Sequence, residues 1–381
     1  MNSTKMRFTI GTLASFAVTA VASAQLPPGY TIAAIDTLGG DRNFANGVSD
    51  TGFVTGNSRK SGSTQLIPYV WQSGVAEEIP ILSGVPTFGR GFGVNDAGLV
   101  AGESGNGPSK PFLYDSVTDT ITDLGSLPGG SGGVANDLNN AGRVVGAASN
   151  GQSVRAFFTD ASTNTGTLTD LATPLGTSDS FARAYGISES GIIAGVARNA
   201  ANSTSEPTLW EPDGLGGYTP VTIGSPAGSV FGEAFAVDDA GNAVGRYSDP
   251  VSNQTRAFFY DGVTSVDLDL LPGVSFDNAR ALDLSDDGLV VGYVADFDNA
   301  PSFGGAAVVW EGTTPTDLNT LIPSGSGWNL LSANAINASG QIVGFGTFGG
   351  ETRAFLLTPI PEPGTLALLG LGGLTLLRRR R

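Results

Sequence analysis

A turn motif recurs seven times along the chain, and this repetition limits the folds that the chain can adopt. Each copy begins with Ser, Asn or Asp, continues with two variable residues, and carries a glycine followed four residues later by a second glycine, as in "DDAGNAVG" from Asp238. Successive copies are 44 to 52 residues apart, a period typical of repeat architectures. The first glycines of the copies are Gly52, Gly98, Gly142, Gly191, Gly241, Gly288 and Gly340.

The motif has the chemistry of a hairpin turn. A short polar side chain at the first position can bond the backbone two residues on, and a glycine at the fourth position allows the positive φ of a type I turn followed by a bulge. The adjacent acids Asp238 and Asp239 are therefore interpreted as turn residues. A catalytic acid pair is disfavoured because the copies "NASG" from Asn337 and "NNAG" from Asn139 contain no acid.

The residues around each turn predict four short strands per repeat. One strand precedes the turn and a second follows it. A third, aromatic or apolar strand comes ten or more residues later, and a fourth short strand usually follows, as in "TITDLGSL". No segment of the body shows sustained helical periodicity. We therefore predict an all-β fold, a seven-bladed β-propeller of four-stranded antiparallel blades. The predicted third strands are 68–71, 111–114, 156–158, 207–210, 257–260, 306–310 and 354–357.

The two ends of the body predict how the ring closes. The seventh repeat stops after its third strand, at Thr358, and the segment 30–38 near the start of the chain matches the position of a fourth strand. We expect this N-terminal strand to complete the last blade, which leaves only short, protected sheet edges. An open solenoid is the alternative.

The N-terminal segment is typical of a secretory signal peptide. Lys5 and Arg7 precede an apolar run over 8–21, and Ala22-Ser23-Ala24 follows it. This order predicts cleavage between Ala24 and Gln25 and export across the inner membrane. A buried N-terminal helix is the alternative. The predicted organisation is a signal peptide over 1–24, a repeat body over 25–358 and a C-terminal tail over 359–381.

The tail has three parts in a fixed order. Pro361, Glu362 and Pro363 are followed by an uncharged run over 365–377, which at 13 residues is short of the roughly 20 needed to span a bilayer. The chain then ends in Arg378, Arg379, Arg380 and Arg381, which would hold that end on the cytoplasmic side of the membrane. On these residues alone the tail is a weak transmembrane segment or a plain membrane anchor.

This order resembles the PEP-CTERM sorting signal. The resemblance implies that a membrane enzyme, exosortase, recognises the tail and cuts it near Pro-Glu-Pro, so that the protein contacts the inner membrane only transiently. It also implies a Gram-negative-type bacterium that makes extracellular polysaccharide. The expected location is the cell surface or the extracellular matrix.

The body resembles the HAF-repeat family of extracellular bacterial proteins. The stretches "DTLGGDRNFANGVSDTGFVTG" and "NAINASGQIVG" match two blocks of the family repeat. The third block departs from it, because Arg155, Arg256 and Arg353 stand where the family has His. The family implies no settled biochemical activity.

Composition excludes several classes of function. The chain has no Cys and no His, so disulfides, thiol ligands and histidine-based catalysis are absent. The net charge is −16, and the body without its terminal segments holds 13 basic and 34 acidic residues. A body this acidic repels phosphate backbones, which excludes nucleic acid as a partner.

Three sets of residues are candidates for chemistry. Asp296, Asp298 and Asn299 offer oxygen ligands for Ca²⁺, with a solvated acidic loop as the alternative. The third-strand aromatics offer a sugar-stacking surface, although packing between blades is the favoured interpretation. A glycosidase on this fold would need two carboxylates about 5 to 9 Å apart, for which the acids of the body are candidates.

The sequence as a whole predicts a secreted, non-catalytic structural or adhesive propeller without a cofactor. Its expected partners are exosortase at the tail and extracellular polysaccharide or surface proteins at the body. A carboxylate-based carbohydrate-active enzyme, hydrolase or lyase, and a Ca²⁺-dependent adhesin are the alternatives.

Overall fold

Strands make up almost all of the regular structure. The computed structural model describes residues 25–361 except 86, 106, 160–167, 175–180, 199–203, 274 and 297–304. Within these residues the helical segments are two 3₁₀ turns, η1 (Pro226–Gly228) and η2 (Leu318–Thr320). None of the described helices is long and apolar enough to span a membrane. The all-β prediction is confirmed.

Six repeats each fold into four consecutive antiparallel strands. Repeats 1 to 3 are β2 (Gly39–Val48), β3 (Val54–Lys60), β4 (Leu66–Gln72), β5 (Val75–Glu78); β6 (Gly89–Val94), β7 (Leu99–Ser104), β8 (Lys110–Asp115), β9 (Thr120–Asp123); and β10 (Gly133–Leu138), β11 (Val144–Ser149), β12 (Val154–Thr159), β13 (Leu168–Asp170). Repeats 4 to 6 are β14 (Ala182–Ile187), β15 (Ile193–Arg198), β16 (Ser205–Pro212), β17 (Tyr218–Thr222); β18 (Gly232–Val237), β19 (Ala243–Ser248), β20 (Thr255–Tyr260), β21 (Ser265–Asp267); and β22 (Asn278–Leu284), β23 (Leu289–Ala295), β24 (Ala306–Glu311), β25 (Thr314–Asp317).

Repeat 7 takes its fourth strand from the other end of the body. It contains β26 (Trp328–Ile336), β27 (Ile342–Phe348) and β28 (Glu351–Pro359), and β1 (Tyr30–Ala34) pairs antiparallel with β28. β1 ends earlier than the predicted segment 30–38. The Asn43 side chain binds the carbonyl oxygens of Ile35 and Asp36, each at 3.0 Å, and so turns the chain away from β28 toward repeat 1.

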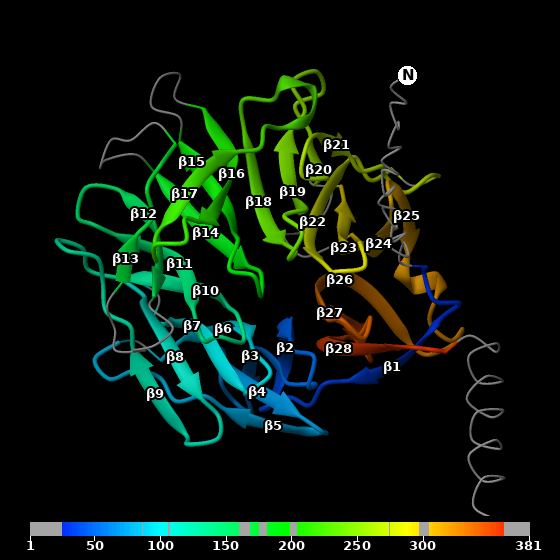
Figure 1. Ribbon diagram of the computed structural model, residues 1–381. Helices are drawn as coiled ribbons and strands as arrows, with labels where there is room; N and C mark the ends of the chain where they lie inside the picture. The colour runs from blue at the N-terminus through cyan, green and yellow to red at the C-terminus, as the bar shows by residue number, and fades with distance from the viewer. Residues whose placement is uncertain are drawn as a thin grey trace, which may run out of the picture.

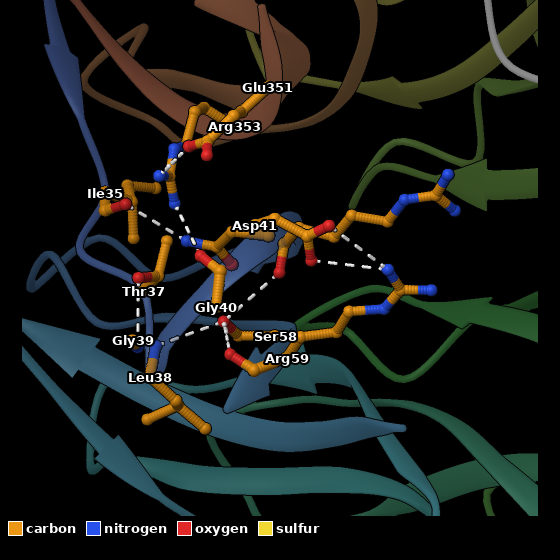
Figure 2. Close-up of polar contacts among 12 residues, drawn as sticks. Ile35, Thr37, Leu38, Gly39, Gly40, Asp41, Ser58, Arg59, Glu351 and Arg353 are labelled. Carbon is orange, nitrogen blue, oxygen red and sulfur yellow. Dashed lines mark hydrogen bonds and ion pairs between the residues drawn. The ribbon is translucent and has the colours of Figure 1, made fainter. Parts of the chain in front are cut away.

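The junction between β1 and β2 is held by polar contacts (Figure 2). Arg353 of β28 donates to the Gly40 carbonyl at 3.0 Å and also pairs with Glu351, while Ser58 of β3 accepts from the Leu38 amide at 3.1 Å. A single parallel bridge between Arg42 and Thr352 joins the strands of repeats 7 and 1 into one eight-stranded sheet. Repeat 7 and repeat 1 are therefore connected by backbone pairing as well as by side chains.

The core consists of seven apolar clusters, each between two consecutive repeats. Trp310 of β24, for example, is fully buried against Val244 of the preceding repeat. One cluster contains Val54 and Tyr69 of repeat 1 together with Val343 of repeat 7. Apolar burial thus stabilises every contact between consecutive repeats, including the contact between the two ends of the body.

The sheets are arranged around a common centre (Figure 1), where residues of all seven repeats line a cavity. The first strand of each repeat contacts the first strand of the next, and β26 contacts β2. All seven first strands contribute to the lining of the cavity, which has a volume of about 180 Å³. The innermost strands therefore bring residues from every repeat to one place.

The two glycines of the turn motif are required for different structural reasons. The first adopts φ between 70° and 93° in all seven turns, and its amide donates to the carbonyl of the first turn residue at 2.9–3.2 Å. The second packs against the first strand two residues before its β-bulge, where an added Cβ would lie 1.9–2.2 Å from a backbone carbonyl oxygen. A side chain at the second glycine would therefore push the two inner strands apart.

Candidate functional site

The bulges of the seven first strands determine which side chains face the central cavity. A register shift interrupts each pairing between first and second strands, and the unpaired residue lines the cavity. Bulges commonly redirect a side chain in this way. The seven bulge residues are Asn46, Phe92, Asn136, Tyr185, Phe235, Leu282 and Asn334.

The three asparagines among these residues bind across to the next repeat. Asn46 donates to the Gly91 carbonyl at 2.8 Å, and Asn136 donates to the Ala184 carbonyl at 2.7 Å. Asn334 donates to the Ala45 carbonyl at 2.7 Å, which connects repeat 7 to repeat 1. These amides connect neighbouring repeats inside the cavity.

Two carboxylates line the same cavity, and each also binds backbone amides. Asp137 accepts from the amides of Leu138 at 2.8 Å and Ile187 at 3.0 Å. Asp283 accepts from the amides of Leu284 at 2.9 Å and Ile336 at 2.8 Å. In both residues one oxygen binds the following residue and the other binds the next repeat. Both carboxylates thus act as inter-repeat connections.

Burial beside the cavity raises the pKa of Asp137 and of Asp283 to about 7 in each case, although the backbone amides that they accept lower it. The charge of Asp137 also raises the pKa of Asp283. These two carboxyl groups therefore take up protons near neutral pH, well above the range of an exposed aspartate. Sequence reasoning missed both, since the corresponding position in the other repeats is Gly or Ala.

The second residues of the seven turns surround one end of the cavity. They are called here the turn-tip ring, which consists of Asp50, Asp96, Asn140, Glu189, Asp239, Asp286 and Ala338. A second cavity of about 190 Å³ lies among the turns and shares Asp137 and Asp283 with the central one. Five of the seven ring residues are acidic, so this end of the molecule is strongly negative.

Side chains of the turn-tip ring accept backbone amides from the turn before them. Asp239, half of the acid pair noted in the sequence, accepts from the Ser190 amide at 2.6 Å, while Asp238 accepts from Ala240 and Asn242 within its own turn. The ring residues are therefore inter-repeat contacts rather than freely variable turn residues. Equivalent bonds run from Thr51 to Asp96, from Asp96 to Asn140, from Asn140 to Glu189 and from Ala338 to Asp50.

Crowding of negative charge is visible in the titration of the ring. Burial raises the pKa of Glu189, and the nearby charges of Asp239, Asp96 and Asp50 raise it further. Asp286 has a raised pKa for the same reasons. Nevertheless, the described part of the chain contains no group of three or more acidic side chains close enough to hold a metal ion.

The opposite end of the first strands carries arginines and aromatic rings. We define the Arg–aromatic cluster as Arg183, Tyr185, Glu233, Arg246, Arg280 and Tyr293, from repeats 4, 5 and 6. The Tyr185 hydroxyl donates to Glu233 at 3.0 Å, and Arg246 pairs with the same carboxylate at 2.6 Å. Each arginine also lies over an aromatic ring of its own repeat. These rings are Phe181 for Arg183, Phe231 for Arg246 and Tyr293 for Arg280, with distances of 5.5, 5.3 and 5.9 Å.

The residues singled out from the sequence have different locations. Asp296 directly follows β23, whereas Asp298 and Asn299 lie outside the described residues, so the calcium hypothesis stays a prediction. Trp210 and Trp310 are fully buried between repeats, and their indole nitrogens donate to the Ala172 and Asp269 carbonyls at 2.6 and 2.9 Å. These third-strand aromatics serve packing rather than sugar stacking.

The predicted processing sites lie at the limits of the described chain. Gln25 is exposed at its start, while Ala24 lies outside it. Pro361 is the last described residue, so Glu362, Pro363, the short apolar run and the four arginines lie outside. The repeat body extends one residue beyond the predicted boundary, since β28 ends at Pro359.

Three arginines of the third strands bind within their own sheet or to the next repeat. They are Arg155, Arg256 and Arg353. Arg155 pairs with Asp170 of β13 at 3.0 Å, and Arg256 pairs with Asp267 of β21 at 2.5 Å. Both acids lie on the fourth strand, opposite Phe157 and Phe258, which are two residues along the third strand from the arginines. These pairs support the outer strands and lie away from the central cavity.

Comparisons with known proteins identify the tail and the fold. Residues 359–381 match the model of the PEP-CTERM protein-sorting motif. No curated protein matches the chain in sequence. A solved structure of YCF48 bound to D1 peptide is similar with a TM-score of 0.51 and 13% identity, over 90% of this chain and 100% of that one. Oligogalacturonate lyase from Vibrio parahaemolyticus gives a TM-score of 0.49 and 12% identity, over 88% and 93% of the two chains. At such identities the likeness concerns the fold alone, which is propeller-like.

The sorting motif implies an exosortase-sorted protein that reaches the outside of a Gram-negative bacterium. The body that it would deliver has a negative turn-tip ring at one end of a central cavity and the Arg–aromatic cluster at the other.

Proposed function

We propose that the chain is a non-catalytic binding module of the bacterial surface or extracellular matrix, built as a closed seven-bladed propeller and carrying extracellular polysaccharide as its ligand. Exosortase would be its partner at the tail, and the resemblance to HAF-repeat proteins fits this extracellular role. The proposal concerns the body, residues 25–358, once the signal peptide and the tail have been processed.

Closure of the ring is supported by three independent contacts between the two ends of the body. β1 pairs with β28, an apolar cluster contains residues of both repeats, and Asp50 accepts from the Ala338 amide at 2.8 Å. A closed ring has no long exposed sheet edge and so resists edge-to-edge aggregation. Such a rigid disc suits a protein that functions outside the cell without disulfides.

The non-catalytic role rests on one observation, which is that the two carboxylates of the central cavity are already hydrogen-bonded to the backbone. Asp137 and Asp283 are the carboxylates that a two-acid mechanism would use, because they come from different repeats and line one cavity. Both oxygens of each already accept backbone amides that belong to the scaffold. A catalytic acid or nucleophile needs an oxygen directed at the substrate, and using one here would break an inter-repeat hydrogen bond.

Co-sedimentation of the secreted protein with the producer's own extracellular polysaccharide tests this function. We expect saturable pelleting with the intact polymer, and the same pelleting with EDTA present. Pelleting that EDTA abolishes would replace the proposal with a Ca²⁺-dependent adhesin. An absence of pelleting would overturn polysaccharide binding and direct the search to a protein partner.

A further inference from the structure

Three arginines lie near one another on an otherwise acidic molecule. The body has 13 basic residues, and three of its arginines belong to the Arg–aromatic cluster, where the defined residues include a single acid, Glu233. An acidic body repels a polyanion at most of its surface, whereas a local excess of arginine attracts one. The cluster is therefore the part of the body best suited to an anionic ligand.

We propose that the Arg–aromatic cluster binds the carboxylate-bearing sugars of an acidic polysaccharide, a polyuronate. This inference rests on the proposed function and names the ligand class and the site. A guanidinium matches a carboxylate with two parallel hydrogen bonds, and the face of an aromatic ring packs against a pyranose ring. The cluster offers both kinds of contact within three consecutive repeats.

The geometry of the cluster holds its groups in place before a ligand arrives. Glu233 is buried, and its two oxygens accept from Tyr185 at 3.0 Å and from Arg246 at 2.7 Å. Tyr185 packs edge-on against Phe235 with 5.3 Å between ring centres. Fixed side chains lose less entropy on binding than mobile ones. Glu233 thus orients the arginine and tyrosine between which a sugar carboxylate would bind.

Arg183 is the cluster residue most suited to contact the ligand. It is half-buried over Phe181 and forms no ion pair with any residue of the described chain. Tyr185, two residues along β14, lines the central cavity, and Arg183 lies close enough for its charge to act on the Tyr185 hydroxyl. Arg280 and Tyr293 extend the cluster into repeat 6, where burial lowers the pKa of Arg280 and the charge of Arg246 lowers it further.

The described part of the chain ends beside the turn-tip ring. β28 runs toward the turn-tip ring, since Gln341 of the seventh turn donates to Thr358 at 3.5 Å and Gly340 lies against Pro359. The sorting motif begins at Pro359, so its first residues lie at the turn end of the body. The Arg–aromatic cluster lies at the other end of the first strands, about five residues or roughly 15 Å away along β14.

Binding of the secreted protein to alginate, a polyuronate, and to dextran, a neutral polysaccharide, tests the proposal. We expect binding to alginate that weakens as salt is raised, and no binding to dextran. Arg183→Gln should lower the affinity for alginate about tenfold, the loss of one charge-assisted hydrogen bond. Arg143→Gln is the matched control, because Arg143 also lies over aromatic rings but sits beside a turn, and it should leave the affinity within about twofold.

Arg183→Lys keeps the charge and tests the site if Arg183→Gln fails to fold. It should lower the affinity about threefold, because an ammonium cannot form the paired hydrogen bonds of a guanidinium. Equal affinity of wild type and both variants, or equal binding of dextran and alginate, would overturn the proposal. If the protein pellets with the producer's polysaccharide and Arg183→Gln leaves this pelleting unchanged, the site alone is overturned. If the protein binds no polymer at all, the proposed function is overturned as well.

Discussion

The amide of Ala338 donates to the carboxylate of Asp50 at 2.8 Å, which joins two turns that are 288 residues apart in the sequence. The same type of bond links most neighbouring turns, so the turn-tip ring acts as a chain of hydrogen bonds around one end of the cavity. Six of its members look interchangeable in the sequence because Asp, Asn and Glu all supply the acceptor oxygen that the preceding turn needs, whereas Ala338 contributes its backbone amide.

Removal of this contact should weaken the junction between repeats 7 and 1. We expect Asp50→Ala to lower the free energy of unfolding by about 1 kcal/mol, the typical net contribution of one hydrogen bond. Asp50→Asn keeps an acceptor oxygen and should lose less than half of that amount. Urea unfolding of the two variants measures the difference. Equal losses would show that charge, rather than the hydrogen bond, is what matters at this position.

The two motif glycines should differ in their tolerance of a methyl group. An added Cβ at Gly245 would lie 1.9 Å from the Glu233 carbonyl oxygen, so Gly245→Ala must separate two inner strands and should cost about 3 kcal/mol. Gly288 has φ of 93° and no atom near an added Cβ, so Gly288→Ala should cost only about 1 kcal/mol of backbone strain. Urea midpoints of the two variants give the comparison, which similar losses would contradict.

The carboxyl group of Asp137 should make stability depend on pH near neutrality. Its pKa is raised to about 7 in the folded protein, above the value near 4 of an unfolded chain. Between these values the folded state binds more protons than the unfolded state, so the contribution of Asp137 to stability increases as the pH falls from 8 to 5. Since the carboxylate also faces a solvent-accessible cavity, we expect about 1 to 2 kcal/mol, less than the full shift would give.

Asp137→Asn isolates this effect from the other acids of the chain. The variant loses the titration, so the stability of wild type relative to the variant should rise as the pH falls from 8 to 5. Unfolding in urea at a series of pH values measures this difference directly. A gap between wild type and variant that stays constant with pH would contradict the assignment.

Loss of the tail should change the destination of the protein and leave its fold intact. All seven apolar clusters are built from residues between Leu26 and Leu357, so deletion of residues 362–381 should leave thermal unfolding of the body unchanged. The deleted chain should still be exported but should not reach the cell surface. Cell fractionation measures the distribution, and a surface fraction equal to that of the intact chain would contradict sorting by this motif.

Much of the fold follows from local patterns that a sequence displays. The turn motif requires a glycine with positive φ, so the positions of the hairpins and of the flanking strands can be read from the Ser, Asn or Asp and the glycine at fixed spacing. The recurrence of the second glycine can also be seen in the sequence, but the reason why this position requires glycine cannot. Its neighbour is a carbonyl of the paired first strand, such as that of Glu233 beside Gly245, and this close approach of two backbones leaves no distinct signal in a single sequence.

The central features could not be predicted because they depend on residues about one repeat apart. Tyr185 and Glu233 are 48 positions apart and meet only when repeats 4 and 5 pack together. Asp137 and Asp283 occupy a position that is glycine or alanine in the other five repeats. This difference can be recognised in the sequence only when the repeats are aligned at the bulge. The resemblance of the tail to a sorting signal, by contrast, rests on contiguous residues and is confirmed for 359–381.

The chain length of the producer's polysaccharide after incubation with the protein tests the central claim most directly. A non-catalytic module leaves its polymer intact, so the size distribution of the polymer should be the same with and without the protein, at a concentration where the polymer pellets with it. Shortened chains with new reducing or unsaturated ends would contradict the account and place Asp137 and Asp283 in a catalytic role.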